Sequence, residues 1–156
     1  GVLRQRRNAG TIEAVGLEVE AEHRYSDALA VRLAAAFTDA EVDGGADAPQ
    51  LTGLQPAQAP RTTVTASVNW RPVAPLSLDV RARYEDKRYE DDINSRVLDA
   101  ATVVDLRAGW KLTPSVEIYA IGENLLDEDV QTGVTGTGVI SYGTPRTFSI
   151  GLNYRM

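Results

Sequence analysis

A chain of 156 residues with 43% hydrophobic residues suits a single domain, and this composition fits soluble and membrane proteins alike. It has no cysteine, which excludes disulfides, thiolate metal ligands and cysteine nucleophiles, and its net charge of −6 argues against general binding to nucleic acid. The richest apolar run, residues 28–37, is interrupted by Arg32, so no helical membrane span is predicted. A barrel span stays possible, because its apolar residues alternate with polar ones.

The first third of the chain predicts two strands. Residues 1–10 are basic and polar without periodicity, and we interpret them as an incoming loop or a broken strand end. Apolar and polar residues alternate over residues 15–24, which predicts a strand that closes in a tight turn. Residues 29–38 also alternate, although their Ala and Leu content leaves an amphipathic helix open. A long loop over residues 39–60 is predicted next.

The middle of the chain predicts a hairpin. Residues 63–70 alternate most cleanly, and the prolines of residues 72–75 predict a stiff short turn. A strand over residues 76–85 then runs into a charged loop that includes residues 86–94.

The last third predicts a second hairpin and a terminal strand. Residues 104–112 alternate, turn at residues 113–115 and continue as a strand over residues 116–121, in which the faces of Tyr119 and Ile121 are undecided. Residues 123–128 could form one helical turn before a Gly/Thr-rich loop.

The terminal strand, residues 146–156, has one apolar and one polar face. Its apolar face holds Phe148, Ile150, Leu152, Tyr154 and Met156. A chain that ends on such a strand suits a sheet that needs it for closure, since an exposed terminal strand invites aggregation.

The connections alternate between short and long, which predicts an all-β, up-and-down antiparallel meander of about seven strands with turns at one end and loops at the other. Strands of about ten residues at ~3.3 Å each, tilted by about 40°, span roughly the 25 Å apolar band of an outer membrane. Aromatic residues fall at both strand ends and indicate two interfacial girdles. The turn-end girdle is Tyr25, Trp70, Trp110 and Tyr154, and the loop-end girdle is Phe37, Tyr84, Tyr89 and Tyr142.

Several segments resemble known proteins. Gly151, Tyr154 and Met156 resemble the C-terminal assembly signal of bacterial outer-membrane β-barrels. Five segments resemble, in order, motifs of the C-terminal β-barrel portion of a TonB-dependent outer-membrane receptor: residues 14–20, 37–41, 60–61, 122–128 and 143–147.

The resemblance implies a transport function. TonB-dependent receptors are 22-stranded barrels, plugged by an N-terminal domain, that use energy delivered by TonB to import scarce ligands such as ferric siderophores or cobalamin. Residues 1–156 would be the last part of such a barrel, without plug or TonB-contacting segment, and should not transport alone. The implied partners are the outer-membrane bilayer, the rest of the barrel, the plug, TonB and the barrel assembly machinery, with no cofactor, metal or nucleic acid; the transported ligand and its binding residues stay unknown.

The charged residues of the strands would line the barrel lumen, where we expect them to neutralise one another. They are Glu18, Glu20, Arg32, Asp79, Arg81, Arg83, Asp105 and Arg107. A soluble β-sandwich or small β-barrel acting as a binding module is the alternative, because alternation alone does not separate water from a lumen.

Other candidate sites favour a structural interpretation. His23 is the only histidine, so a transition-metal site and a Ser/His/Asp triad have little support, and an enzyme is not predicted. Two acidic groups could supply oxygen ligands for Ca²⁺, but neither has EF-hand spacing, and solvated loop charge is favoured. These groups are residues 39–47 and residues 85–94. Gly133, Gly136 and Gly138 do not match a phosphate-binding loop and predict a flexible one.

Overall fold

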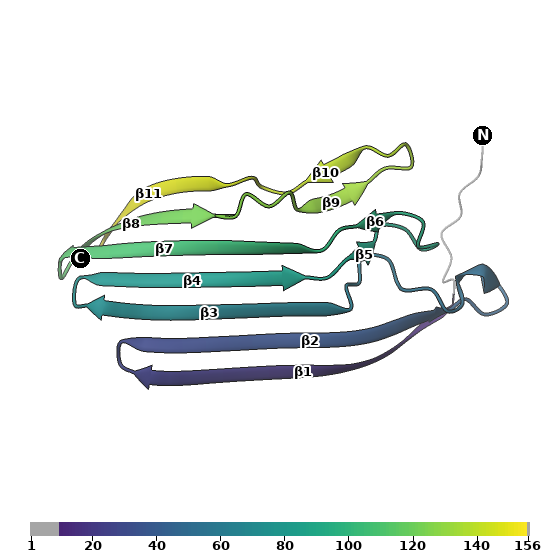
Figure 1. Ribbon diagram of the computed structural model, residues 1–156, viewed down its shortest axis with the longest axis horizontal. Helices are drawn as coiled ribbons and strands as arrows, with labels where there is room; N and C mark the ends of the chain where they lie inside the picture. The colour runs from purple at the N-terminus through teal and green to yellow at the C-terminus, as the bar shows by residue number, and fades with distance from the viewer. Residues whose placement is uncertain (1–9, 156) are drawn as a thin grey trace.

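A computed structural model describes residues 10–155 as one seven-stranded sheet with the order β1-β2-β3-β4-β7-β8-β11 (Figure 1). All neighbours are antiparallel. The strands are β1 (Thr11–Ser26), β2 (Leu29–Asp43), β3 (Thr62–Val73), β4 (Leu76–Glu85), β7 (Ala101–Thr113), β8 (Val116–Glu123) and β11 (Thr147–Tyr154). The predicted meander is confirmed, with three short connections at the left in Figure 1 and the long ones at the right. We call these the turn end and the loop end.

The first two strands are longer than predicted. Continuous pairing of β1 with β2 begins at Thr11 and Asp43, so β2 runs five residues into the segment predicted as a loop. The helix alternative for residues 29–38 is wrong. Its alanines do not decide the conformation because β2 pairs with a strand on each side, and sheet pairing outweighs local propensity.

The long connections carry structure of their own, contrary to the prediction of plain loops. Between β2 and β3 lies a short 3-10 helix, η1 (Pro49–Leu51). Strands β5 (Arg88–Tyr89) and β6 (Val97–Leu98) pair between β4 and β7, and β9 (Gln131–Val134) and β10 (Ile140–Tyr142) pair between β8 and β11. No helix within residues 10–155 has the length and apolar character needed to cross a membrane.

Two further local predictions are wrong. The helical turn over residues 123–128 does not form: Glu123 ends β8, and Asn124 and Asp127 have φ angles of 50° and 57°, which belong to the left-handed region. Pro72 lies within β3 rather than in a turn, at an irregularity of the β3–β4 pairing between Trp70 and Val73. A proline is tolerated there because the ladder hydrogen bond is already interrupted.

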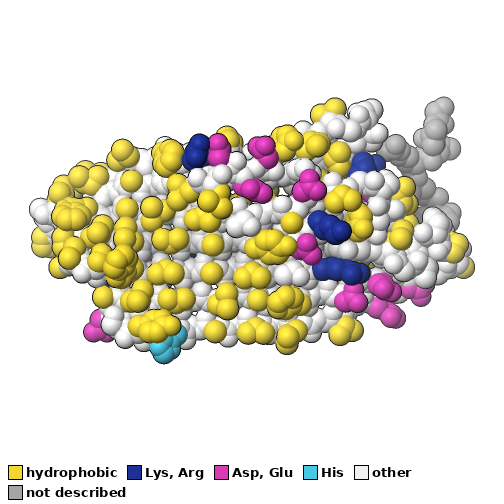
Figure 2. All heavy atoms as spheres, in the orientation of Figure 1, with side chains coloured by type: hydrophobic (Ala, Val, Ile, Leu, Met, Phe, Trp, Pro, Cys, Tyr) yellow, Lys and Arg dark blue, Asp and Glu magenta, His cyan; other side chains and the backbone are white. Residues whose placement is uncertain are grey.

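The two faces of the sheet differ in chemistry. The outer face holds the apolar residues, and cross-strand pairs such as Val31 with Val68 and Val68 with Val80 continue it from strand to strand. Figure 2 shows this face, where hydrophobic side chains cover the strands and most charges lie at the right, at the loop end. Val15 is 80% exposed and Ile150 82% exposed, so the structure leaves an apolar surface that water would not favour.

No second sheet packs on either face of the main sheet within residues 10–155 (Figure 1). The hydrophobic residues buried there are Ala40, Ala48 and Leu98, and all three lie at the loop end of the sheet. The β-sandwich alternative requires two packed sheets and is therefore wrong.

Two neighbouring alanines test which face contacts lipid. Ala35 lies on the outer face between Val19 and Val64, whereas Ala34 lies on the inner face beside Glu20. We expect Ala35→Arg to lower the unfolding free energy of the intact barrel in lipid vesicles by up to ~2–4 kcal/mol, because its charge enters the acyl chains. Ala34→Arg, the matched control, should lower the unfolding free energy much less. Equal costs would contradict the assignment of the faces.

Candidate functional site

The inner face of the sheet carries the polar and charged side chains. Near the turn end, Arg32 of β2 pairs with Glu22 of β1 at 2.9 Å between Nε and Oε2. Asn69 of β3 donates a hydrogen bond to the carboxylate of Asp79 on β4. Each contact gives an inner-face carboxylate a hydrogen-bond donor from a neighbouring strand.

Arg107 of β7 is the centre of the largest polar cluster. Its guanidinium pairs with the carboxylate of Glu117 on β8, and its Nη1 lies 4.0 Å from Oδ2 of Asp79. The same guanidinium stacks on the ring of Tyr119, 4.8 Å from the centroid. Predicted mutual neutralisation is confirmed for Arg32 and Arg107, and Tyr119, whose face was undecided, points inward.

Two glycines make room for this cluster. A Cβ on Gly109 would collide with Oε1 of Glu117 and with Oγ of Ser77, 2.8 Å away. A Cβ on Gly151 would collide with the Tyr119 ring, because Gly151 and Tyr119 are directly opposite on β11 and β8. Gly151 therefore has a packing role in addition to its predicted part in the assembly signal.

The other predicted lumen charges behave differently. Arg81 and Arg83 form no ion pair within residues 10–155. Asp105 lies opposite Arg81 in the β4–β7 register, but its Oδ1 accepts a hydrogen bond from the backbone N–H of Asn124 at 3.0 Å. This carboxylate therefore anchors the chain where it leaves β8.

Asn124 is a buried polar residue that sequence reasoning missed. It is 3% exposed, its Nδ2 donates to the carbonyls of Glu128 (2.9 Å) and Thr144 (3.2 Å), and its Oδ1 accepts from Glu128 N–H (2.9 Å). Asparagine also tolerates the left-handed φ better than most residues. The signal that could have located it is the family motif at residues 122–128, which overlaps the predicted helical turn over residues 123–128.

At the loop end, the three long connections contact one another. Asn94 exchanges hydrogen bonds with the backbone of Gln55, at 2.9 Å and 2.8 Å. Arg88 donates to the side chain of Gln58 at 2.8 Å and to the carbonyl of Gln131 at 3.2 Å. These contacts join the β2–β3, β4–β7 and β8–β11 connections into one surface.

The acidic residues of the loop end are used in turns and ion pairs. Asp39 pairs with Arg61 at 3.1 Å, and Glu85 with Arg88 at 2.6 Å. A hydrogen bond from the Ser95 hydroxyl, aided by backbone N–H groups, lowers the pKa of Asp91 below its usual value. Within residues 10–155 no three His, Asp or Glu side chains gather as a metal-binding group.

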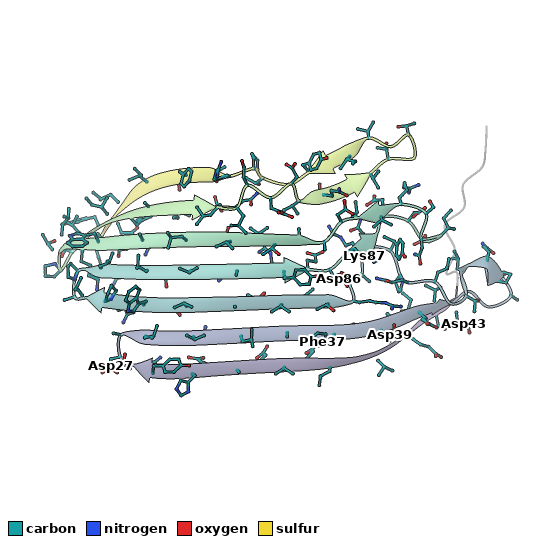
Figure 3. All side chains as sticks on the ribbon, in the orientation of Figure 1. Asp27, Phe37, Asp39, Asp43, Asp86 and Lys87 are labelled. Atoms are coloured by element: carbon teal, nitrogen blue, oxygen red, sulfur yellow. The ribbon has the colours of Figure 1, made fainter. Side chains whose placement is uncertain are left out.

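The predicted turn-end girdle residues lie beside the turns of the main sheet, and Phe37 and Tyr84 lie on β2 and β4, whereas Tyr89 and Tyr142 lie on β5 and β10, outside the main sheet. Trp70 and Trp110 both pair with residues of β4, Leu78 and Leu76, beside the turn, and Tyr154 pairs with Val116. Tyr25 stacks edge-on with His23, 4.2 Å between ring centroids. Figure 3 places Phe37 well along β2 from Asp27 in the first turn, with Asp39, Asp43, Asp86 and Lys87 farther toward the loops.

The remaining predictions concern flexible segments and termini. Gly133, Gly136 and Gly138 lie in and around the β9–β10 hairpin, where Gly138 has a φ of 84° that suits its turn. The segment predicted as a flexible loop therefore contains a hairpin, and its flexibility stays a prediction. Met156 and residues 1–9 lie outside the described residues, so that part of the assembly signal stays a prediction.

Comparison with known proteins supports the fold. Residues 2–125 match the family model described as TonB dependent receptor-like, beta-barrel. The ferrioxamine B receptor of Salmonella typhimurium is 32% identical over 111 residues, which cover 69% of this chain and 16% of that protein.

Solved structures agree with the family match. The ferric yersiniabactin uptake receptor FyuA from Yersinia pestis superposes with a TM-score of 0.84 at 23% identity, covering 94% of this chain and 24% of that one. The siderophore receptor PiuA from Acinetobacter baumannii gives a TM-score of 0.81 at 18% identity, covering 92% and 22%. The chain thus spans less than a quarter of each of these proteins.

Asn124 offers a test of the connection after β8. We expect Asn124→Leu to destabilise the protein by ~1–3 kcal/mol, because the carbonyls of Glu128 and Thr144 lose their donor and the left-handed φ becomes strained. Asn124→Gly keeps the backbone conformation and should recover part of the loss. Chemical unfolding measures both variants, and identical destabilisation would show that the backbone conformation contributes nothing.

The Gly151 contact offers a second test. We expect Gly151→Val to destabilise the barrel by ~1–3 kcal/mol, since its side chain displaces the Tyr119 ring from Arg107. Tyr119→Ala should relieve that collision, so the double variant should lose less stability than the sum of the two single variants. Strict additivity in chemical unfolding would argue against the contact.

Proposed function

This chain belongs to the β-barrel family of TonB-dependent receptors, which are outer-membrane proteins, and on that premise we propose that residues 1–156 form the last seven strands of a 22-stranded barrel that imports a ferric siderophore. The family consists of receptors rather than enzymes, and we propose that this protein carries out no catalysis. The whole barrel would contact the outer-membrane bilayer, a plug domain, TonB and the barrel assembly machinery.

The observation that supports the proposal best is the open, two-faced sheet. Within the described residues β1 and β11 each pair on one side only, and the sheet has an apolar outer face and a charged inner face. An open edge in a membrane leaves backbone groups without hydrogen-bond partners, so further strands must complete the barrel. A seven-stranded sheet alone would have no closed lumen.

The ligand class follows from the relatives. The Salmonella protein is named a ferrioxamine B receptor, and the solved neighbours include receptors for ferric yersiniabactin and other siderophores. Ligand recognition in a barrel of this kind would fall to the loop end, where hydrogen bonds join the three long connections into one polar surface. We therefore propose a ferric siderophore as cargo.

Uptake of radioactive iron tests this proposal. The complete protein containing this chain is expressed in a Gram-negative strain that lacks its own siderophore receptors, and cells receive ferrioxamine B or ferric yersiniabactin. We expect uptake of at least one complex that stops when TonB is deleted. Deletion of residues 147–156, which removes the pairing partner of β8, is the control and should abolish the assembled barrel.

Two results would contradict the proposal. Uptake that continues without TonB would exclude energy coupling. An assembled, heat-modifiable barrel that takes up neither ferrioxamine B, ferric yersiniabactin nor other ferric siderophores would exclude the proposed cargo class.

A further inference from the structure

Four arginines at the loop end form ion pairs, and Arg88 differs from the other three. Each of the others pairs with an acid of its own long connection or of the strand that enters it: Arg61 with Asp39, Arg96 with Asp91 and Arg146 with Asp127. The side chain of Arg88 is 12% exposed, whereas those of the other three are 35%, 45% and 56% exposed. Arg88 is therefore the most buried of these cations.

The guanidinium of Arg88 contacts all three long connections. Its Nη1 pairs with Oε1 of Glu85, where β4 enters the β4–β7 connection, at 2.6 Å. Its Nε donates to Oε1 of Gln58 in the β2–β3 connection at 2.8 Å, and its Nη2 donates to the carbonyl of Gln131 in the β8–β11 connection at 3.2 Å. Each partner uses a different nitrogen, which only the planar fork of an arginine provides.

The two glutamines that Arg88 contacts are also bonded back to the β4–β7 connection. Gln58 donates from its backbone N–H to the carbonyl of Tyr89 at 2.7 Å, and from Nε2 to the carboxylate of Glu90. The side chain of Gln131 accepts from the N–H of Asp99 at 3.2 Å and donates to its Oδ2 at 2.8 Å. Arg88 thus lies between two sets of contacts that join different connections, and β6 lies against β9 beside it (Figure 1).

The connections would otherwise be tied only to their own strands. Gln58 and Gln131 lie 30 and 43 residues from Arg88 along the chain, and long surface connections are mobile unless specific contacts fix them. Hydrogen bonds from a charged donor are stronger than neutral ones, and their loss would leave part-buried acceptors unpaired. All of these contacts form within residues 58–131, so they need no strand beyond this chain.

We propose that Arg88 is a positioning residue that holds the three long connections in one fixed arrangement before any ligand binds. A surface whose parts are already fixed loses less conformational freedom on binding, which favours tighter binding. The consequence for a ferric siderophore rests on the proposed function, whereas the fixing of the connections does not.

Hydrogen exchange in the complete protein in detergent, without siderophore, tests the positioning role. The reporters are the backbone N–H groups of Gln58 and Asp99, which donate across connections. We expect Arg88→Gln to accelerate exchange at both by about tenfold or more, because each connection can then open separately. The strands of the main sheet should exchange as in the wild type, and heat-modifiable migration should confirm an assembled barrel.

Arg88→Lys is a second variant that keeps the positive charge beside Glu85. We expect it to accelerate exchange at Gln58 and Asp99 as well, since one ammonium group cannot replace three guanidinium nitrogens with separate partners. This variant keeps the test valid if Arg88→Gln does not assemble.

Two matched controls each remove a loop-end arginine that pairs within one connection. Arg61→Gln should leave exchange at Asp99 unchanged, and Arg146→Gln should leave exchange at Gln58 unchanged. Each control loses one positive charge and one ion pair, as Arg88→Gln does, so any general effect of charge would appear in all three variants.

The affinity for ferrioxamine B and ferric yersiniabactin is the second readout. For a complex that the wild type binds, we expect Arg88→Gln to weaken binding by about tenfold, mainly through slower association. Only molecules with the connections in place are then competent to bind, and a smaller competent fraction lowers the apparent affinity. A residue that touched the ligand would instead act mainly on dissociation.

Three results would overturn the proposal. The first is wild-type exchange at both reporter amides in an assembled Arg88→Gln barrel. The second is equal acceleration in the two controls at the amides named for them. The third is a loss of affinity that lies entirely in faster dissociation. A wild-type protein that binds no ferric siderophore would contradict the cargo proposal alone, because hydrogen exchange is measured without ligand.

Discussion

Backbone hydrogen bonding within one sheet is the interaction on which the rest of the structure depends. No second layer covers either face in residues 10–155, so the strand ladders, and not a packed interior, hold the chain together. In hydrocarbon an unpaired N–H or C=O costs several kcal/mol, which makes complete pairing a condition for crossing the membrane. Both the length of the strands and the need for partners beyond β1 and β11 follow from this condition.

The two-residue period made most of the main sheet predictable, because alternation is local and marks the apolar face of each strand by itself. The seven strands and three tight turns follow from this alternation and from the breaks in it. Alternation cannot show where a strand ends outside the membrane, because both faces of the strand are polar there. Residues 39–43 read as loop because of Asp39, Glu41 and Asp43, yet pairing with the start of β1 keeps them extended. The short β5–β6 and β9–β10 hairpins were missed because two to four residues carry too little periodicity.

The inner face shows what sequence alone could not supply. The alternation of polar and apolar residues predicts which charged side chains point inward, but it does not distinguish Arg81 from Arg107. Their difference lies in neighbours on other strands: Gly109 leaves space that lets Arg107 reach Glu117, while Asp105, opposite Arg81, is held by the backbone of Asn124. Such pairings depend on register, which two-residue periodicity does not determine.

The long connections at the loop end, with the strand residues next to them, carry most of the acidic side chains. Residues 39–61, 85–99 and 123–146 hold fourteen Asp or Glu and five Lys or Arg, whereas the remaining described residues hold eight of each. Four of those five cations are paired with loop acids, namely Arg61, Arg88, Arg96 and Arg146. Long connections in water accommodate excess acid because solvent and turn hydrogen bonds stabilise it. The three two-residue turns contain a single charged residue, Asp27, so the acidic excess of the described residues lies at the loop end of the sheet.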